Sequence, residues 1–304
     1  MEGLRLIEFG KIYTSGEILE HSKELAKEHP GHLHYRRAGE SHDGREIPGL
    51  LLGDSGKCLI VSSAIHGRES LNPALLLRMA EDYALIRENE YRDPGLDEWQ
   101  ELLTDYSIYF LPLMNPDGYE IALRGFSEIR NPLFGNIAAA KGILHTEWKE
   151  NGRGVDINRN FPCASYQARE GMKKSASEQE TRALIHAFGE FPESVGYIDF
   201  HSRGRIIYYY RDAMPYRYNR RAKCIAKHLQ KISGYALGKR KEEHASRNDG
   251  GNSVNFYSET YRKPALTVET VGDEEEFPLN PALQAETYQE TRWIPLEFLK
   301  NLLE

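Results

Sequence analysis

Short, unbroken apolar runs alternate with helix-like segments along most of this 304-residue chain. A run such as Leu59–Val61 shows none of the polar alternation that marks a strand with one side in water. Strands of this kind are buried on both faces, which requires helices on both sides of the sheet. The pattern predicts an α/β protein with three layers, α/β/α, around a mixed, mostly parallel sheet. With no internal repeat and no linker, we expect one domain over residues 1–304.

Local signals predict where the strands and helices lie. Apolar runs predict strands near 33–39, 46–53, 58–63, 106–113, 195–200, 205–211 and 264–270. Helical spacing and start or stop residues predict helices over 15–28, from Asn72, over 176–191 and 218–232, and from 282 onward. We expect Ser15 to cap the first helix. Residues 120–175 are loop-rich, and loops of that length in a compact domain are usually functional.

Composition excludes several classes of function. The net charge of −7 gives no reason to expect nucleic acid or an anionic membrane as partner. No stretch approaches 18 apolar residues, so we expect no membrane span. Three cysteines without a C-x-x-C motif argue against a disulfide framework. Residues 1–8 lack the features of a signal peptide, which favours a cytoplasmic protein, although a chain trimmed of its leader would look the same. The sequence leaves the oligomeric state open.

Two strands are followed directly by side chains that can bind a metal. His66 and Glu69 stand three apart after the run Leu59–Val61, so one turn can aim both groups at a single zinc ion at about 2 Å. Alone, this pair is usually a solvated turn. His201 follows the strand at 195–200, where open α/β sheets bind their ligands, and is the candidate third ligand. A catalytic zinc site keeps its fourth position for water.

Other polar residues complete a candidate active site. Glu269 lies in an apolar strand, where an unpaired carboxylate is costly, so it is either half of a salt bridge or a general base with a raised pKa. Asn158 and Arg159 together offer an amide and a guanidinium that suit a carboxylate. Asp156 is a candidate acceptor for the free ring N–H of a zinc-binding histidine.

In this order, these segments resemble the zinc carboxypeptidase family, the M14 peptidases related to pancreatic carboxypeptidase A. The resemblance covers about residues 12–300 and rests on His66–Glu69, Asn115–Gly118, Gly154–Phe161, Ser177–Thr181, His201 and Glu269. It implies that His66, Glu69 and His201 hold one Zn²⁺ per chain. It also implies that Glu269 activates the attacking water and that Asn158 and Arg159 bind the terminal carboxylate of the substrate.

The chain departs from the pancreatic pattern at three places. The arginine that stabilises the oxyanion has no direct match, so Lys149 or Arg153 must serve. The mobile tyrosine of the family has no match either, and His244 is the candidate hydrogen-bond donor in its place. The residue that tunes the specificity pocket falls near Val254, which carries no charge.

Two stretches, Trp148–Asp156 and His201–Tyr209, resemble bacterial γ-D-glutamyl-meso-diaminopimelate peptidases. This narrower resemblance implies a small cell-wall muropeptide as substrate. We expect Arg203 to pair with the second carboxylate of diaminopimelate, and Asp249 or Asn255 to take its amine.

Three other functions stay open at this point. The protein could be an ordinary metallocarboxypeptidase that releases C-terminal residues. It could be a deacylase of the aspartoacylase or succinylglutamate type, although these usually lack the Asn158–Phe161 run. A non-catalytic relative that has lost its zinc is disfavoured because the three ligand candidates and Glu269 are all present.

Overall fold

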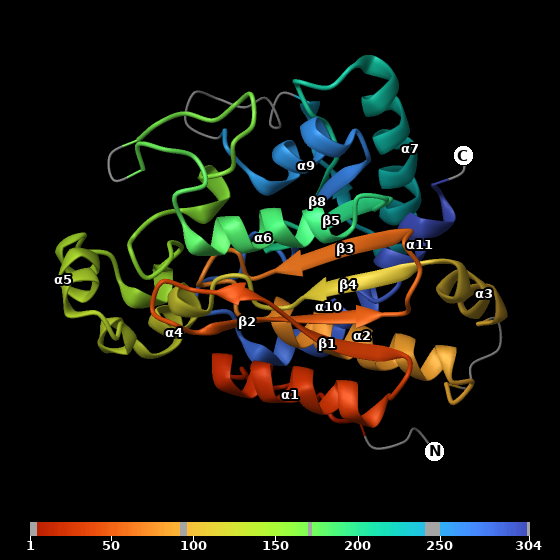
Figure 1. The fold of residues 1–304 in the computed structure, drawn as a ribbon, viewed down its shortest axis with the longest axis horizontal. Coiled ribbons are helices and arrows are strands. Elements are labelled where there is room, and N and C mark those ends of the chain that lie inside the picture. Colours follow the sequence, from red (N-terminus) through yellow and green to blue (C-terminus); the bar gives the residue numbers. More distant parts are fainter. Residues whose placement is uncertain (1–4, 92–95, 170–171, 241–249, 303–304) are drawn as a thin grey trace.

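A computed structural model describes residues 5–91, 96–169, 172–240 and 250–302. Within these residues the strands form one eight-stranded sheet in the order β1-β2-β4-β3-β5-β8-β6-β7 (Figure 1). Its strands are β1 (Leu33–Glu40), β2 (Glu46–Leu52), β3 (Cys58–Ser63), β4 (Ser107–Leu111), β5 (Gly196–Ser202), β6 (Ile206–Tyr208), β7 (Ala236–Leu237) and β8 (Ala265–Thr270).

The central strands run parallel. β3 pairs in parallel with β4 and with β5, and β5 pairs in parallel with β8. The pairs β1–β2, β2–β4 and β6–β8 are antiparallel, so the sheet is mixed, as predicted. Because β3, β5 and β8 are parallel neighbours, the residues that follow them meet at one edge of the sheet.

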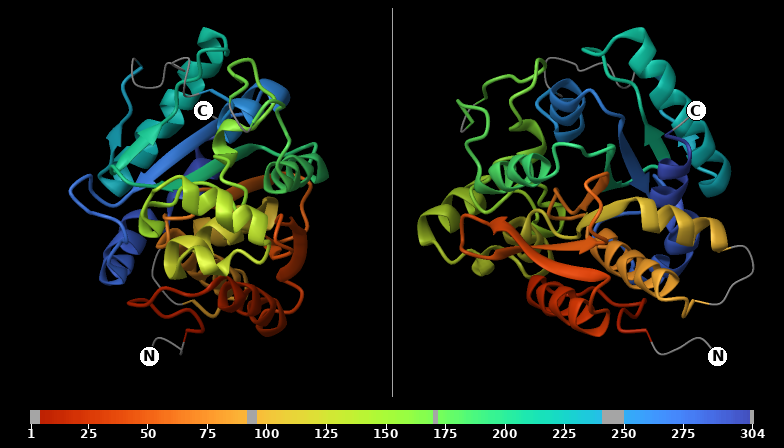
Figure 2. Two further views of the ribbon diagram at one scale, coloured as in Figure 1. Left: turned by 90° about the vertical axis from the view of Figure 1, so that its left-hand side faces the viewer. Right: turned by 45° about the vertical axis from the view of Figure 1, so that its right-hand side comes forward.

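Helices cover both faces of the sheet and enclose one apolar core on each side (Figures 1 and 2). The larger core packs α1 (Ser15–Glu28), α2 (Asn72–Arg87), α3 (Asp97–Asp105), α7 (Tyr216–Ser233), α10 (Gln284–Thr291) and α11 (Ile294–Lys300). The other core packs α6 (Gln179–Glu190) and α9 (Ser253–Tyr261). The result is the three-layer α/β/α domain that the strand pattern predicts.

Several elements differ from the prediction. Thr14, not Ser15, caps α1, because Thr14 and Glu17 form a reciprocal capping box. Residues 120–175, expected to be loop-rich, include the second half of α4 (Pro116–Arg124) and all of α5 (Pro132–Ala140). The helix expected from 282 is divided into α10 and α11, and Pro295 stands at the start of the second. α3 and α9 were not predicted. None of the helices within the described residues has the length and apolar character of a membrane span.

Candidate active site

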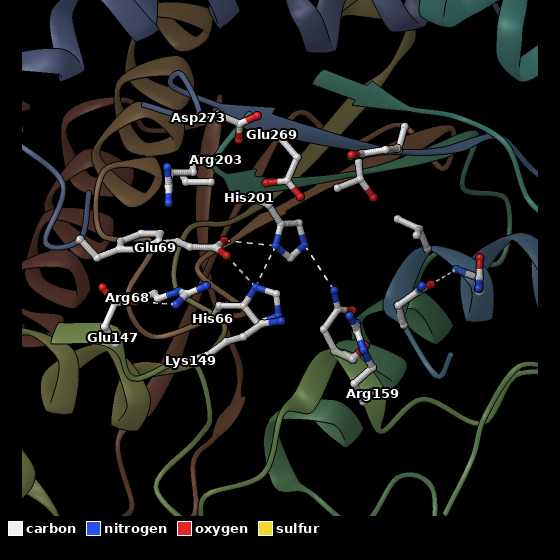
Figure 3. Close-up of a pocket in the computed structure, with 18 of the residues that line it drawn as sticks. His66, Arg68, Glu69, Glu147, Lys149, Arg159, His201, Arg203, Glu269 and Asp273 are labelled. Atoms are coloured by element: carbon white, nitrogen blue, oxygen red, sulfur yellow. Dashed lines mark hydrogen bonds and ion pairs between the residues drawn. The ribbon is translucent and has the colours of Figure 1, made fainter. Parts of the chain in front are cut away.

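Three buried side chains converge at the edge of the sheet where β3 and β5 end. His66 and Glu69 follow β3, and His201 is the penultimate residue of β5. Their ligand atoms lie within 4.8 Å of one another (Figure 3). The Nδ1 atoms of the two imidazoles are 3.1 Å apart, and Glu69 places its carboxylate oxygens 2.6 Å from Nδ1 of His66 and 3.1 Å from Nδ1 of His201.

This donor set fits zinc. Two imidazole nitrogens and a carboxylate are a common ligand set of catalytic zinc, and atoms that each lie about 2 Å from one ion are close to 3 Å apart. Burial alone would raise the pKa of Glu69, but the imidazoles of His66 and His201 hold it well below its ordinary value. A lowered pKa favours the deprotonated carboxylate, which is the form that can bind a metal ion.

Each histidine turns its other ring nitrogen toward an aspartate. Nε2 of His66 lies 3.4 Å from Oδ1 of Asp156, and Nε2 of His201 lies 3.0 Å from Oδ2 of Asp199. Such carboxylates fix the ring orientation and tautomer of metal-binding histidines. Asp199 was missed in the sequence, although a carboxylate two residues before His201 in an apolar strand is as unusual as Glu269.

Glu269 lies beside this cluster on the neighbouring strand. It pairs in register with His201 across β5 and β8, and it lines a cavity of about 480 Å³ that also exposes the metal-binding groups. Burial raises the pKa of Glu269 to about 7, although the nearby His201 opposes this shift. Among the described residues no side chain forms an ion pair with Glu269, so the salt-bridge interpretation has no partner in this part of the chain.

The structure distinguishes between Lys149 and Arg153, the two candidate cations for stabilising the oxyanion. Lys149 lines the cavity, and its Nζ lies 3.2 Å from Oδ2 of Asp156. Arg153 is not among the lining residues. Its Nη1 lies 3.4 Å from Oε1 of Glu178, and its guanidinium stacks on the Phe134 ring at 5.7 Å. Only Lys149 of this pair therefore faces the metal-binding groups.

The candidate carboxylate clamp also lines the cavity. Asn158 and Arg159 lie in a 3-10 turn, and Asp156 caps it by accepting from the backbone N–H of Asn158. Oδ1 of Asn158 in turn accepts from the backbone N–H of Ser253, the first residue of α9. Val254 and Asn255, on the same helix, line the cavity as well. His244 and Asp249 lie outside the described residues.

The cavity also has lining residues that the sequence analysis did not select. They are Arg68, Glu147, Ser202, Tyr208, Arg211, Asn252, Thr267, Asp273 and Phe277. Arg68 could have been suspected, because it stands between two metal-ligand candidates. Arg211 and Phe277 lie several residues after the ends of β6 and β8, and no sequence motif next to them indicates that they line a cavity.

Backbone contacts hold the metal-binding turn in place. A Cβ at Gly67 would lie 2.2 Å from the carbonyl oxygen of Gly118, and a Cβ at Gly118 would lie 2.1 Å from that of Glu150. The backbone N–H of Gly67 also donates to the carbonyl of Lys149. The three segments can pack this closely only because two of them carry glycine at the contact.

A second group of possible metal ligands, two of them buried, lies beside Arg153. It consists of His42, Glu178 and Glu180. Asn151 donates through Nδ2 to a carboxylate oxygen of each glutamate, at 2.8 and 3.1 Å. Burial raises the pKa of Glu180 to about 7, whereas hydrogen bonds from His42 and Asn151 outweigh burial at Glu178 and lower its pKa to about 2. These contacts make the group a hydrogen-bonded network that anchors the 151–153 turn.

Comparison with known proteins shows which proteins this chain resembles in sequence and in fold. Residues 18–294 match the family model described as zinc carboxypeptidase. A curated relative, gamma-D-glutamyl-L-diamino acid endopeptidase 1 of Lysinibacillus sphaericus, is 23% identical over 285 residues, which is 87% of this chain and 67% of the relative.

Two solved structures share the fold. Carboxypeptidase A from Helicoverpa armigera superimposes with a TM-score of 0.73 at 20% identity, over 97% of this chain and 74% of that one. The murein-tripeptide amidase MpaA from Escherichia coli O157 superimposes with a TM-score of 0.53 at 15% identity, over 89% of this chain and 92% of the other. At these identities the likeness concerns the fold alone.

Proposed function

Because this chain belongs to the zinc carboxypeptidase family, we propose that it is a zinc metallopeptidase that cuts the γ-D-glutamyl–diaminopimelate bond of small cell-wall muropeptides. The metallopeptidase part follows from the family and the donor set of His66, Glu69 and His201. The substrate is the proposed part. The observation that carries it is the charged and polar lining of the cavity, which offers little of the apolar surface that an aromatic C-terminal residue needs.

Different residues of the cavity can perform the separate steps of amide hydrolysis. When bound, zinc supplies a Lewis acid that polarises the scissile carbonyl and increases the acidity of water. Glu269 accepts the proton of the attacking water and delivers it to the leaving amine, a role that its raised pKa suits. The ammonium of Lys149 stabilises the negative charge that develops on the carbonyl oxygen.

Asn158 and Arg159 determine how the substrate is positioned in the cavity. Asn158 and Arg159 hold the free carboxylate of the residue that leaves, which places the bond before it near Glu269. In the tripeptide L-Ala-γ-D-Glu-diaminopimelate, that residue is diaminopimelate, so the reaction is formally a carboxypeptidase step.

The side chain of diaminopimelate ends in a second ammonium and a second carboxylate. Arg211 lines the cavity as a buried cation, and its guanidinium donates to the backbone carbonyls of Tyr210 and Ala265 at 2.7 and 3.0 Å. These bonds hold the guanidinium in one orientation, which suits a planar carboxylate. Asn255 offers an amide oxygen for the ammonium. The endopeptidase of Lysinibacillus sphaericus and the murein-tripeptide amidase are both named for substrates of this class, which supports the proposal.

The deciding experiment compares this tripeptide with a peptide that ends in Phe or Lys. We expect a higher kcat/KM for the tripeptide, and loss of both activities when zinc is removed with a chelator. Faster hydrolysis of the ordinary peptide would reject the muropeptide substrate and leave a general metallocarboxypeptidase. Activity that survives complete removal of the metal would reject the mechanism as well.

A further inference from the structure

Helix α7 exposes a strongly basic face. Its eighteen residues, Tyr216–Ser233, include no aspartate or glutamate but carry three arginines, three lysines and one histidine. We propose that this face is a docking surface for an anionic lipid membrane. The docking surface is independent of the proposed substrate. Its members, which we call the α7 basic face, are Arg217, Arg220, Lys223, Lys227 and Lys231.

The α7 basic face follows from the spacing of its members. Steps of three, seven and four residues separate four of them, and at 3.6 residues per turn these steps place all four in one row along the helix. The row is about 21 Å long, because each residue adds about 1.5 Å to a helix. Lys223 lies beside the row. The opposite side of α7 is buried in the larger core through Tyr218, Ala222, Ile225, Ala226 and Leu229.

The charges of this face are not neutralised within the described part of the chain. None of its five side chains forms an ion pair or a hydrogen bond with a described residue, and all five are exposed. His228 lies on the same helix but 3.9 Å from Glu297, so we leave it out of the face. Arg221 is left out as well, because it donates to the backbone carbonyl of Leu302. The α7 basic face therefore presents five cations to an approaching surface.

The net charge of −7 for the whole chain does not describe this face. Dissolved salt screens charges beyond about 8 Å at physiological ionic strength. A flat surface that touches α7 therefore senses the cations nearest to it and little of the acidic side chains elsewhere. Clusters of this size on one helix face are typical of segments that bind anionic lipid headgroups.

Two apolar side chains at the ends of α7 favour a lipid membrane over a soluble polyanion. Tyr216 is 82% exposed at the start of the helix, and Ile232 is 39% exposed at its end. Aromatic and aliphatic side chains beside cations suit the boundary between lipid headgroups and acyl chains. Nucleic acid is better matched by a basic groove or by a helix that can enter the major groove. By contrast, α7 is packed against the core along its length and lies at the outer margin of the molecule (Figures 1 and 2).

The α7 basic face leaves the active site open. None of its residues lines the cavity, although Arg211, which stands shortly before the helix, does. A protein that is docked through α7 therefore keeps the cavity free for a peptide.

The test measures binding of the intact zinc protein to vesicles of two compositions. One consists of equal parts of phosphatidylglycerol and phosphatidylcholine, and the other of phosphatidylcholine alone. We expect the protein to sediment with the anionic vesicles only, and to be released as the salt concentration rises, because salt screens the attraction. Lys227→Gln combined with Lys231→Gln should weaken this binding by about 25-fold, since each cation contributes about fivefold.

The matched control is Lys23→Gln combined with Lys27→Gln. These lysines stand one turn apart on α1, as Lys227 and Lys231 do on α7, so both double variants change the net charge equally. α1 packs by β1 and β2 at one edge of the sheet, whereas α7 packs by β6 and β7 at the other. The control should bind anionic vesicles as the wild type does.

Cys224 provides a probe of the contact itself. It is exposed and lies among the cations of the face. A polarity-sensitive dye attached to Cys224 should shift its emission to shorter wavelength when anionic vesicles are added. The same labelling of Cys224→Ser should show no such shift.

Three results would overturn the docking surface. One is equal binding of the wild type and the Lys227/Lys231 double variant to anionic vesicles. Another is unchanged dye emission while the labelled protein sediments with the vesicles, which would place the contact elsewhere. The third is binding to double-stranded DNA without binding to vesicles, which would assign the face to a soluble polyanion.

Discussion

Asp199 provides the sharpest test of how the fold prepares the metal site. It is completely buried in β5, and its Oδ2 accepts from Nε2 of His201 at 3.0 Å and from Ser253 Oγ at 2.6 Å. Its Oδ1 accepts from Ser62 Oγ at 2.7 Å. If Asp199 orients His201 for zinc, loss of its charge must weaken zinc binding even though no direct ligand changes.

The structure indicates how large this effect is. In Asp199→Asn the amide oxygen can still accept from His201 and Ser253, and the hydroxyl of Ser62 can turn to accept from the new NH₂ group. The change is then from a charged to a neutral acceptor, which lowers a hydrogen-bond contribution of about 1.5–3 kcal/mol to about 0.5–1.5 kcal/mol. A loss of about 1.4 kcal/mol corresponds to tenfold weaker zinc binding. Asp199→Ala also leaves the ring N–H without its acceptor, so we expect a larger loss of about 100-fold.

Competitive titration of the apoprotein with a chromophoric zinc chelator, at one fixed pH, measures both affinities. The control is Asp82→Asn, because Asp82 is also buried but binds Tyr288 and Arg5 and does not line the cavity. The control should lower the free energy of unfolding and leave zinc affinity unchanged. Zinc affinity within twofold of wild type in both Asp199 variants, or an equal loss in the control, would refute the reasoning.

Three further predictions concern catalysis, binding and stability. Glu269→Gln removes the proton acceptor without changing its shape, so kcat should fall by at least about 100-fold with zinc retained, and an active variant would contradict the assigned role. Arg159→Ala should mainly raise KM for substrates with a free C-terminal carboxylate, by about tenfold or more, and amidation of that carboxylate should abolish the difference from wild type. Glu180 has its pKa raised by burial to about 7, so its contribution to stability is complete below pH 4.5 and is lost as pH rises through 7. Urea unfolding should therefore show that the free energy of unfolding of Glu180→Gln rises relative to that of the wild type between pH 5 and pH 8. A difference in free energy of unfolding that does not change with pH would contradict this.

The sequence predicts an element most accurately where a single physical requirement, such as burial on both faces of the sheet, determines its structure. The run from Cys58 to Ser63 must be buried on both faces, and β3 has the predicted bounds. Because β3, β5 and β8 are parallel, the side chains after them come together without further information, and His66, His201 and Glu269 lie in one cavity.

Elements that depend on distant partners could not be read locally. α9 contains Val254, Phe256 and Tyr257, which are weak helix formers, and its helix is stabilised by their burial in the core that also packs α6. The choice between Lys149 and Arg153 is similar. Arg153 turns away from the cavity because Glu178, 25 residues further along the chain, is there to pair with it.

The contact of Gly67 with Gly118, and of Gly118 with Glu150, limits how this enzyme can be altered. A side chain at either glycine would push the metal-binding turn away from its partners, so mutant libraries made to obtain new specificities should keep these positions unchanged. The segments around Arg203 and Phe277 line the cavity without belonging to that contact. Randomising positions 203 and 277 alone leaves His201 and the metal-binding turn intact, so selection for cleavage of a new substrate can begin from variants that still load zinc.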